Sequence, residues 1–290
     1  MGDPLRPLPV SETAPAKLNV FLRVLGKRDD GYHDLETLVQ PITLADGVRA
    51  AHRDEGFGLV IAGEWSAEVP AGPENLVLAA ARVLAKETGE ARGANLTLVK
   101  RVPVAAGLGG GSADAAATLR ALDRLWGIGL PPERLSEIGA GVGSDVPALV
   151  GGGPVVARGR GERLESVPVG RTWWVLMIQG FGVPVGQAYE WWDEDGGRTG
   201  PDPAPLLEAI AVADAARLGP FLFNDLEEPV AARHPEVARA RARLLAAGAL
   251  GAVMCGSGPT VAGLSRDGRH CEELAQAVGG IAVGSVIRSP

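Results

Sequence analysis

Apolar and polar residues alternate along several short stretches of the chain, and this period of two is typical of β-strands with one buried face. The clearest stretch is 16–25, where four aliphatic residues alternate with Lys17, Asn19 and Arg23. Further strands are predicted at 35–39, 48–51, 58–61, 95–99, 173–178, 251–254 and 281–286. We expect 48–51 and 58–61 to pair as a hairpin, and 157–164 to form a turn or hairpin.

A spacing of three and four between apolar residues predicts helices elsewhere. In 75–88 this spacing places Leu76, Ala80 and Leu84 on one face. Other helices are predicted at 112–125, 131–138, 205–215, 234–247 and 271–278, and 193–198 is predicted to be a charged, solvated loop. Strands and helices are segregated in this order, which favours an α+β fold. We place a domain boundary near Gly170, so that the domains are 1–169 and 170–290.

Composition narrows the class of protein. The 290 residues are 46% hydrophobic and 22% charged, as in soluble globular proteins. No run approaches the roughly 20 apolar residues of a membrane span, and the N-terminal segment 1–14 lacks the apolar core of a secretory signal, so we expect a cytoplasmic protein. The net charge of −7, without a basic stripe, argues against nucleic acid as a partner. Two cysteines, Cys255 and Cys271, cannot fill a four-ligand zinc site, and we expect both to be small, partly buried residues.

The strongest local signal is a glycine-rich loop that we call the glycine loop, residues 103–113, with the sequence Pro-Val-Ala-Ala-Gly-Leu-Gly-Gly-Gly-Ser-Ala. A predicted strand leads into it, and a predicted helix whose first turn has only small residues follows. Unpaired N–H groups and the positive end of the helix dipole make such a segment an anion site, and phosphate is its natural occupant. A Walker loop would need Lys-Ser or Lys-Thr after the last glycine. Because Ser112-Ala113 follows Gly111 instead, positive charge must come from elsewhere.

Four further places carry candidate chemistry, each with an ordinary alternative. Lys17 lies within a predicted strand, where its ammonium either reaches solvent or meets a carboxylate. Asp145 lies between glycines and is either a functional carboxylate or a turn-former. Tyr32 and His33 are either a platform for a base or exposed loop residues. The glycine-rich turn 254–260 either closes over the glycine loop or is only a tight hairpin.

In order and spacing these segments resemble the GHMP kinases. That superfamily has a Pro-Ala-Lys strand, a Pro-x-x-x-Gly-Leu-Gly-x-Ser-Ser phosphate loop and a glycine-rich C-terminal turn. Here they correspond to Pro15-Ala-Lys17, Pro103 to Ser112 and Gly256-Ser-Gly-Pro-Thr260. Within the superfamily, Pro15 to Asn19, the Gly-Tyr-His segment at 31–33, Gly143 to Pro147 and Asn224 to Glu227 look like the diphosphocytidyl-methylerythritol kinase branch of isoprenoid biosynthesis.

The resemblance implies a two-domain α+β fold, with an N-terminal ribosomal-S5-like ATP-binding domain and a C-terminal ferredoxin-like domain around the site. It implies ATP and Mg²⁺ as cofactors, a cytidine-diphosphate-linked polyol as the small-molecule substrate, and phosphorylation of its 2-hydroxyl. Asp145 would accept the hydroxyl proton, while Lys17 would keep that carboxylate ionised and stabilise phosphoryl charge. The oligomeric state expected is a monomer or weak homodimer.

The resemblance also implies the binding residues. The ATP-binding residues would be Asn75, Leu76, Lys100, Pro103, Val104, Ala105, Ala106, Gly107, Leu108, Gly109, Gly110, Gly111, Ser112 and Ala113. Tyr32 and Tyr189 would sandwich the cytosine, and His33 and Asn19 would hydrogen-bond the substrate.

Two departures from the family pattern concern substrate contacts and phosphate contacts. Ala113 stands where many relatives have a second serine, and Val185 replaces the threonine of a Pro-Thr-Pro run.

Two alternatives remain: another GHMP kinase, acting on homoserine or a mevalonate-type substrate, or a non-catalytic GHMP-fold ligand-binding protein. The Tyr32-His33 pair argues against the first, and the presence of both Lys17 and Asp145 argues against the second.

Overall fold

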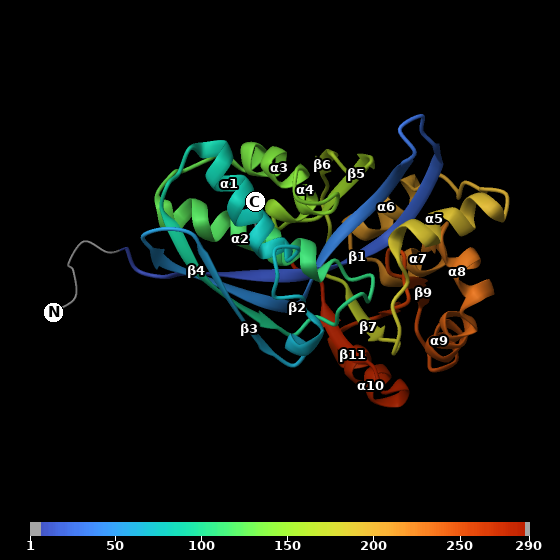
Figure 1. Ribbon diagram of the computed structural model, residues 1–290. Helices are drawn as coiled ribbons and strands as arrows, with labels where there is room; N and C mark the ends of the chain where they lie inside the picture. The colour runs from blue at the N-terminus through green and yellow to red at the C-terminus, as the bar shows by residue number, and fades with distance from the viewer. Residues whose placement is uncertain (1–6, 288–290) are drawn as a thin grey trace. The chain divides into compact units, whose positions relative to one another are not determined.

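A computed structural model describes residues 7–287 and divides them into two compact units (Figure 1). Unit 1 contains the chain up to Ala16, Leu44–Val104 and Gly109–Gly152; unit 2 contains Lys17–Thr43, Ala105–Leu108 and the chain from Gly153 onward. Two long strands, β1 (Val10–Lys27) and β2 (His33–Arg53), contribute to both units. The units therefore differ from a single cut at residue 170, and that boundary stays a prediction. The predicted absence of a secretory signal concerns 1–14, which lies partly outside the described residues.

Three strands of unit 1 pair side by side, and their order corrects one prediction. The second half of β2 pairs antiparallel with β4 (Gly93–Lys100), and β3 (Phe57–Gly63) pairs parallel with the other edge of β4. The predicted hairpin between 48–51 and 58–61 is therefore wrong, because β4 lies between those two strands. Burial explains the order: the residues of β4 are mostly buried, whereas none of those of β3 is fully buried.

The helices of unit 1 are gathered on one side of these strands (Figure 1). They are α1 (Leu76–Thr88), α2 (Gly110–Trp126), α3 (Pro132–Ala140) and α4 (Val146–Val150), with a short 3₁₀ turn, η1 (Ser66–Glu68). Helix α2 contacts the other three helices. Its face is rich in alanine, and the small side chains Ala113, Ala117 and Ala121 are fully or nearly fully buried. Small residues allow neighbouring helices to approach α2 closely.

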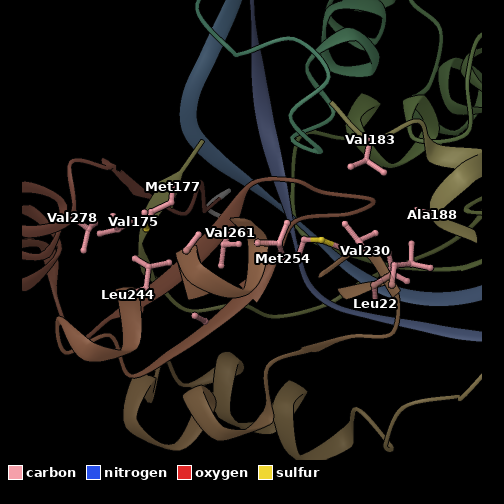
Figure 2. Close-up of a cluster of buried hydrophobic side chains, with 14 of the residues drawn as sticks. Leu22, Val175, Met177, Val183, Ala188, Val230, Leu244, Met254, Val261 and Val278 are labelled. Carbon is pink, nitrogen blue, oxygen red and sulfur yellow. The ribbon is translucent and has the colours of Figure 1, made fainter. Parts of the chain in front are cut away.

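Unit 2 is built around a four-stranded antiparallel sheet in the order β11-β7-β10-β9. The strands are β7 (Trp173–Met177), β9 (Gly251–Met254), β10 (Val261–Ser265) and β11 (Ile281–Gly284). Helices α9 (Pro235–Ala246) and α10 (Gly268–Val278) pack on this sheet. Figure 2 shows the buried core that results, in which Val175, Met254 and Val261 of the sheet lie with side chains such as Leu244 and Val278.

The other elements of unit 2 join the long strands or connect the sheet. They are β5 (Val155–Gly159), β6 (Arg163–Ser166), β8 (Phe223–Asn224), α5 (Val185–Glu194), α6 (Ala204–Ala211), α7 (Ala215–Leu218), α8 (Glu227–Arg233) and η2 (Gly219–Phe221). The antiparallel pair β5–β6 confirms the hairpin predicted at 157–164, and β5 also pairs with the first half of β2. Strand β8 pairs parallel with β1.

Most predicted elements are present, and the mixed α+β composition is confirmed. The helix predicted at 205–215 is two helices, α6 and α7, because the chain turns at Ala213 with a φ of 55°. The predicted loop at 193–198 is wrong at its start, because α5 continues to Glu194. Both cysteines are free, and both are fully buried where partial burial was predicted. Between residues 7 and 287 no helix is long and apolar enough to cross a membrane.

Candidate active site

The glycine loop begins where β4 ends, and its first glycine is required by packing within unit 2. Gly107 has a φ of 76°, which favours glycine. A Cβ at this position would collide with the Cys255 carbonyl oxygen and would lie 2.8 Å from that of Gly258. The turn at 254–260 therefore contacts the glycine loop, so the first of its two interpretations holds.

The later glycines of the loop lie at the start of α2 in unit 1. Gly109 has a φ of 67° and precedes the helix, which starts at Gly110, two residues earlier than predicted. A Cβ on Gly110 would lie 3.0 Å from Lys100 Nζ, and one on Gly111 would lie 3.3 Å from Leu76 Cδ1. The first N–H groups of the helix have no partner within it, and only small side chains surround them. This cradle of backbone amides at a positive helix end fits a phosphate group.

Lys100 belongs to a buried cluster of three charges in unit 1. Its ammonium is 2.5 Å from Asp46 Oδ2 and 2.9 Å from Asp114 Oδ2, and all three side chains are almost completely buried. Asp46 also accepts hydrogen bonds from the backbone N–H groups of Arg101 and Val102, at 2.5 and 2.8 Å. The cluster thus ties the end of β4, where the glycine loop begins, to the second half of β2 and to α2.

Asp114 carries an unusual proton affinity for a carboxylate. Burial raises its pKa, Lys100 lowers it and the neighbouring Asp46 raises it again, to about 7. Its second oxygen, Oδ1, is buried and has no hydrogen-bond partner among the described residues. A buried oxygen without a partner is costly when it carries charge, which agrees with a carboxyl group that keeps its proton near neutral pH.

Lys17 lies in the middle of β1 and is buried, with only 4% of its surface exposed. Its ammonium donates to Asn19 Oδ1 at 2.6 Å, and Asn19 Nδ2 in turn donates to Thr37 Oγ1 at 2.8 Å. Its backbone N–H donates to the Leu108 carbonyl of the glycine loop at 2.9 Å. A Cβ on Gly256 would lie 3.0 Å from Lys17 Nζ. Within unit 2, Lys17 therefore lies beside both glycine-rich segments.

Asp145 is exposed and immediately precedes α4 in unit 1. The other end of this short helix is held by Arg120 of α2, whose guanidinium donates to the carbonyls of Leu149 and Val150 at 3.1 and 3.2 Å. Arg120 also donates to the Thr13 carbonyl at 2.8 Å. The helix that carries Asp145 is thus tied to the helix that begins at the glycine loop. Because Asp145 and Lys17 belong to different units, their predicted pairing stays a prediction.

The predicted cytosine residues lie in unit 2, and the structure gives each an aromatic or cationic neighbour. Tyr32 is 52% exposed, and the Arg160 guanidinium lies 3.5 Å from the centre of its ring. The Tyr189 ring, on α5, stacks on His33 with centroids 4.8 Å apart. The His33 ring nitrogen Nε2 lies 2.9 Å from Asp193 Oδ1. The structure thus brings His33 and Tyr189 together, while the sandwich of cytosine between Tyr32 and Tyr189 stays a prediction.

Asp193, which sequence reasoning did not select, holds His33 together with Lys27. Lys27 Nζ lies 2.7 Å from Asp193 Oδ2. Burial raises the pKa of Asp193, but the hydrogen bonds from Lys27 and His33 outweigh it, so the pKa lies below the usual value of an aspartate. An ionised Asp193 accepts a hydrogen bond from His33 Nε2–H and orients the His33 ring.

The remaining predicted ATP-binding residues flank the cradle in unit 1. Asn75 is the N-cap of α1: its Oδ1 accepts from the Val77 N–H at 2.9 Å and its Nδ2 donates to the Pro70 carbonyl at 2.7 Å. Leu76 begins that helix and packs on Gly111. Both polar atoms of the Asn75 side chain are hydrogen-bonded within the protein. Asn75 therefore supports the phosphate cradle by holding the start of α1 in place.

Whether Mg²⁺ could bind here depends on the oxygen atoms that the protein offers as ligands. Among residues 7–287, no three histidine, cysteine or acidic side chains gather as a metal cage would require. Mg²⁺ is commonly bound through substrate phosphates with only one or two protein oxygens. Ser112, in the first turn of α2, has a hydroxyl beside the phosphate cradle. The residues therefore fit a metal ion that enters with the nucleotide.

Sequence reasoning missed several residues that shape these places. They are Asp46, Asp114, Arg120 and Asp193. One signal was visible: Asp114 is a single charge in a run of small residues on the buried face of α2. A charged residue in such a place needs a buried partner. The partner of Asp114 is Lys100, and the second carboxylate on Lys100, Asp46, lies 54 residues before it and could not be deduced.

Comparisons with known proteins identify the class. The GHMP kinases N terminal domain model matches residues 75–153, and the GHMP kinases C terminal model matches residues 206–281. Among solved structures, a homoserine kinase from Cytophaga hutchinsonii has a TM-score of 0.75 at 18% identity, covering 99% of this chain and 97% of its own. At that identity the likeness shows the fold alone.

Two further comparisons narrow the family. The 4-diphosphocytidyl-2-C-methyl-D-erythritol kinase of Moorella thermoacetica is 45% identical over 269 residues, which are 91% of this chain and 93% of the relative. A crystal structure of 4-(cytidine 5'-diphospho)-2C-methyl-D-erythritol kinase matches with a TM-score of 0.82 at 34% identity, covering 96% of this chain and all of its own. The chain therefore belongs to the GHMP kinases, in the family of the 4-diphosphocytidyl-2-C-methyl-D-erythritol kinases. The fold expected from the sequence is confirmed.

Proposed function

We propose that this chain transfers the γ-phosphoryl group of ATP to the 2-hydroxyl of 4-diphosphocytidyl-2-C-methyl-D-erythritol, a step in isoprenoid precursor biosynthesis. The observation that carries the proposal is the 45% identity, over nine tenths of the chain, to a kinase named for this substrate. The glycine loop, Lys17 and Asp145 supply the residue types that phosphoryl transfer to an alcohol needs.

The glycine loop would bind the ATP phosphates. The backbone N–H groups at the start of α2 have no partner within the helix, and they form the cradle described above. Leu76, at the start of α1, would offer an apolar surface to the adenine, with Asn75 and Lys100 behind it. Mg²⁺ bound with ATP would neutralise phosphate charge, with Ser112 as the protein oxygen nearest to that role.

Two residues would carry the chemistry. The substrate oxygen attacks the γ-phosphorus, the bond from that phosphorus to the β–γ bridging oxygen breaks, and the hydroxyl proton passes to the Asp145 carboxylate. The Lys17 ammonium stabilises the charge on the transferring group, because a fixed cation in a buried position needs no reorganisation. This assignment requires Asp145 and Lys17 to meet around the substrate.

Recognition of the cytidyl group would fall to unit 2. Tyr32 and Tyr189 would stack on the base, and His33 and Asn19 would donate or accept hydrogen bonds. In the tautomer whose Nε2–H donates to Asp193, His33 would present Nδ1 as an acceptor, which would suit the exocyclic amine of cytosine. The cytoplasmic location and the monomeric or weakly dimeric state stay predictions.

The test is direct. Purified protein is incubated with ATP, Mg²⁺ and 4-diphosphocytidyl-2-C-methyl-D-erythritol, and the product is examined by phosphorus NMR. We expect a new phosphomonoester resonance, with coupling that places it on the 2-position, and one ADP per product. A product phosphorylated elsewhere, or ADP release without a phosphorylated polyol, would contradict the proposal. Omitting Mg²⁺ tests the metal, and we expect turnover to disappear.

A further inference from the structure

Asn224 is a buried polar residue that the resemblance gives no role in the reaction. It is 7% exposed and lies in β8, paired in register with Leu22 of β1, the strand that also carries Lys17. Its Nδ2 donates to the carbonyls of Met254 and Gly256, at 2.8 and 2.7 Å. Its Oδ1 accepts from the Leu226 N–H at 2.9 Å. Both donors and the acceptor are engaged, which fixes the orientation of the amide.

Of the two carbonyls that Asn224 holds, that of Met254 immediately precedes the turn 255–258 and that of Gly256 lies within it. The turn has two bonds of its own: the Cys255 N–H donates to the Thr260 carbonyl, and the Gly258 N–H donates to the Cys255 carbonyl, both at 2.8 Å. At its start, the Met254 N–H donates to Glu227 Oε2 at 2.8 Å. Asn224 is thus a side chain that hydrogen-bonds a residue within the turn itself, Gly256.

The opposite side of the turn faces the reacting groups of unit 2. A Cβ on Gly256 would lie 3.0 Å from Lys17 Nζ and 3.2 Å from Asn19 Oδ1. Gly107 of the glycine loop packs against the carbonyls of Cys255 and Gly258. A shift of the turn by a fraction of an ångström would therefore displace the ammonium or the loop.

We propose that Asn224 is a positioning residue that fixes the turn 255–258 against Lys17 and the glycine loop. The proposal rests on the function proposed above for Lys17. Asparagine suits the task because one planar group carries two donors in fixed geometry, which span two carbonyls of the same turn. Serine would offer one donor. Without the amide, two buried carbonyls lose their partner, and the turn can move to find others.

The test compares Asn224→Ala and Asn224→Ser with a matched control, Asp225→Ala. Asp225 is the next residue and holds the Val24 and Gly200 N–H groups, at 2.8 and 3.0 Å, on the far side of β8 from the turn. Each variant is measured for melting temperature, kcat and both KM values. We expect Asn224→Ala to lower kcat about tenfold or more and to leave the KM of the cytidyl substrate within about threefold. Asn224→Ser should fall between, and Asp225→Ala should lose stability but keep kcat within about twofold.

A purely structural role predicts a different pattern. Then kcat per folded molecule would be unchanged in Asn224→Ala, or Asp225→Ala would lose as much, and either result overturns the proposal. If Asn224→Ala does not fold, Asn224→Ser decides: wild-type kcat in that variant would also overturn it.

A second measurement needs no substrate and so separates this proposal from the function. Hydrogen exchange of the backbone amides at 255–258 should accelerate in both Asn224 variants relative to Asp225→Ala. If the wild-type protein does not phosphorylate the cytidyl substrate, the proposed function fails while the exchange result still tests the hold on the turn. Unchanged exchange in Asn224→Ala would show that the amide does not fix the turn.

Discussion

Two of the four lysines in the chain are buried, and the charges around them differ. Lys100 is 2% exposed and is bound by two carboxylates, those of Asp46 and Asp114. Lys17 is 4% exposed, and it donates to the neutral amide of Asn19 and lies beside the backbone of Gly256. Two carboxylates hold the Lys100 ammonium within unit 1. The Asn19 amide orients the Lys17 ammonium beside Gly256, and a fixed orientation is what a group that stabilises phosphoryl charge requires.

We expect Lys100 to act in the scaffold of the glycine loop and Lys17 to act in the chemistry proposed above. Lys100 links the end of β4 to α2 beside Gly110, and the Lys17 backbone N–H donates to the Leu108 carbonyl of the loop. A scaffold residue and a reacting residue should respond differently to the same substitution, and the variants below use this difference.

The largest effect is expected for Lys100→Met. Removing the ammonium leaves Asp46 and Asp114 buried together, and breaking a buried ion pair from one side costs about 3–5 kcal/mol. Urea unfolding at pH 7.5 measures the change. The double variant Lys100→Met with Asp46→Asn should recover part of the loss, because one stranded charge is removed. A loss of unfolding free energy below about 1 kcal/mol would contradict the scaffold assignment.

Lys17→Met should leave the fold nearly intact and reduce turnover. Loss of one fixed group that stabilises charge in the transition state typically lowers kcat about 10²–10³-fold. Lys86→Met, at an exposed lysine of α1, is the control for loss of a positive charge and should keep wild-type kcat. Steady-state kinetics and a melting curve on both variants are sufficient. Turnover within about threefold of wild type in folded Lys17→Met would contradict the role of Lys17 in the chemistry.

Asp114→Asn should change how stability depends on pH. The pKa of Asp114 is about 7 in the folded protein, above the ordinary value of about 4 in an unfolded chain. The folded state therefore binds the proton more tightly, and the stabilisation this gives is present below about pH 4 and is lost as pH rises through 7. Asparagine resembles the protonated form and removes this loss.

The measurement is the unfolding free energy of both proteins at pH 5 and pH 8. The variant should gain on the wild type by about 2–3 kcal/mol between these values. A difference that is constant with pH, or that shrinks as pH rises, would mean that Asp114 is ionised throughout.

The smallest effect is expected for recognition of the cytidyl group. This prediction tests whether unit 2 binds that group. Tyr32→Ala should raise the KM of the cytidyl substrate roughly tenfold, since stacking on a base contributes about 1–3 kcal/mol. The KM of ATP should barely change, and Tyr32→Phe should be nearly silent because the ring supplies the stacking. Arg160→Ala separates loss of the guanidinium neighbour from loss of the ring. An unchanged KM of the cytidyl substrate in folded Tyr32→Ala would show that Tyr32 does not stack on the cytosine.

How much the sequence predicts depends on whether a feature is local. The strand around Lys17, the helix after the glycine loop and the anion site at its start follow from alternation, spacing and glycine content. The hairpin 48–51/58–61 fails because β4, more than thirty residues later, inserts between its strands. Local patterns carry no information about such an insertion.

The candidate site shows the same limit. Lys17 was predicted either to reach solvent or to meet a carboxylate. Its ammonium is buried and donates to Asn19, two residues away in the same strand. The partners of Lys100 were not predictable, because Asp46 lies 54 residues before it in sequence. The contact of Gly107 with the turn 255–258 was one of two open alternatives, since it joins segments about 150 residues apart. Long-range contacts of this kind are set by the fold as a whole.

The most direct test of the account is the choice among acceptor alcohols. Initial rates of ADP release are measured with ATP, Mg²⁺ and each of 4-diphosphocytidyl-2-C-methyl-D-erythritol, homoserine and mevalonate, over a range of concentrations. The account predicts a kcat/KM for the cytidyl substrate at least about a hundredfold above the other two, because two stacking contacts to the base add about 2–6 kcal/mol of recognition. An equal or higher kcat/KM for homoserine or mevalonate would contradict it.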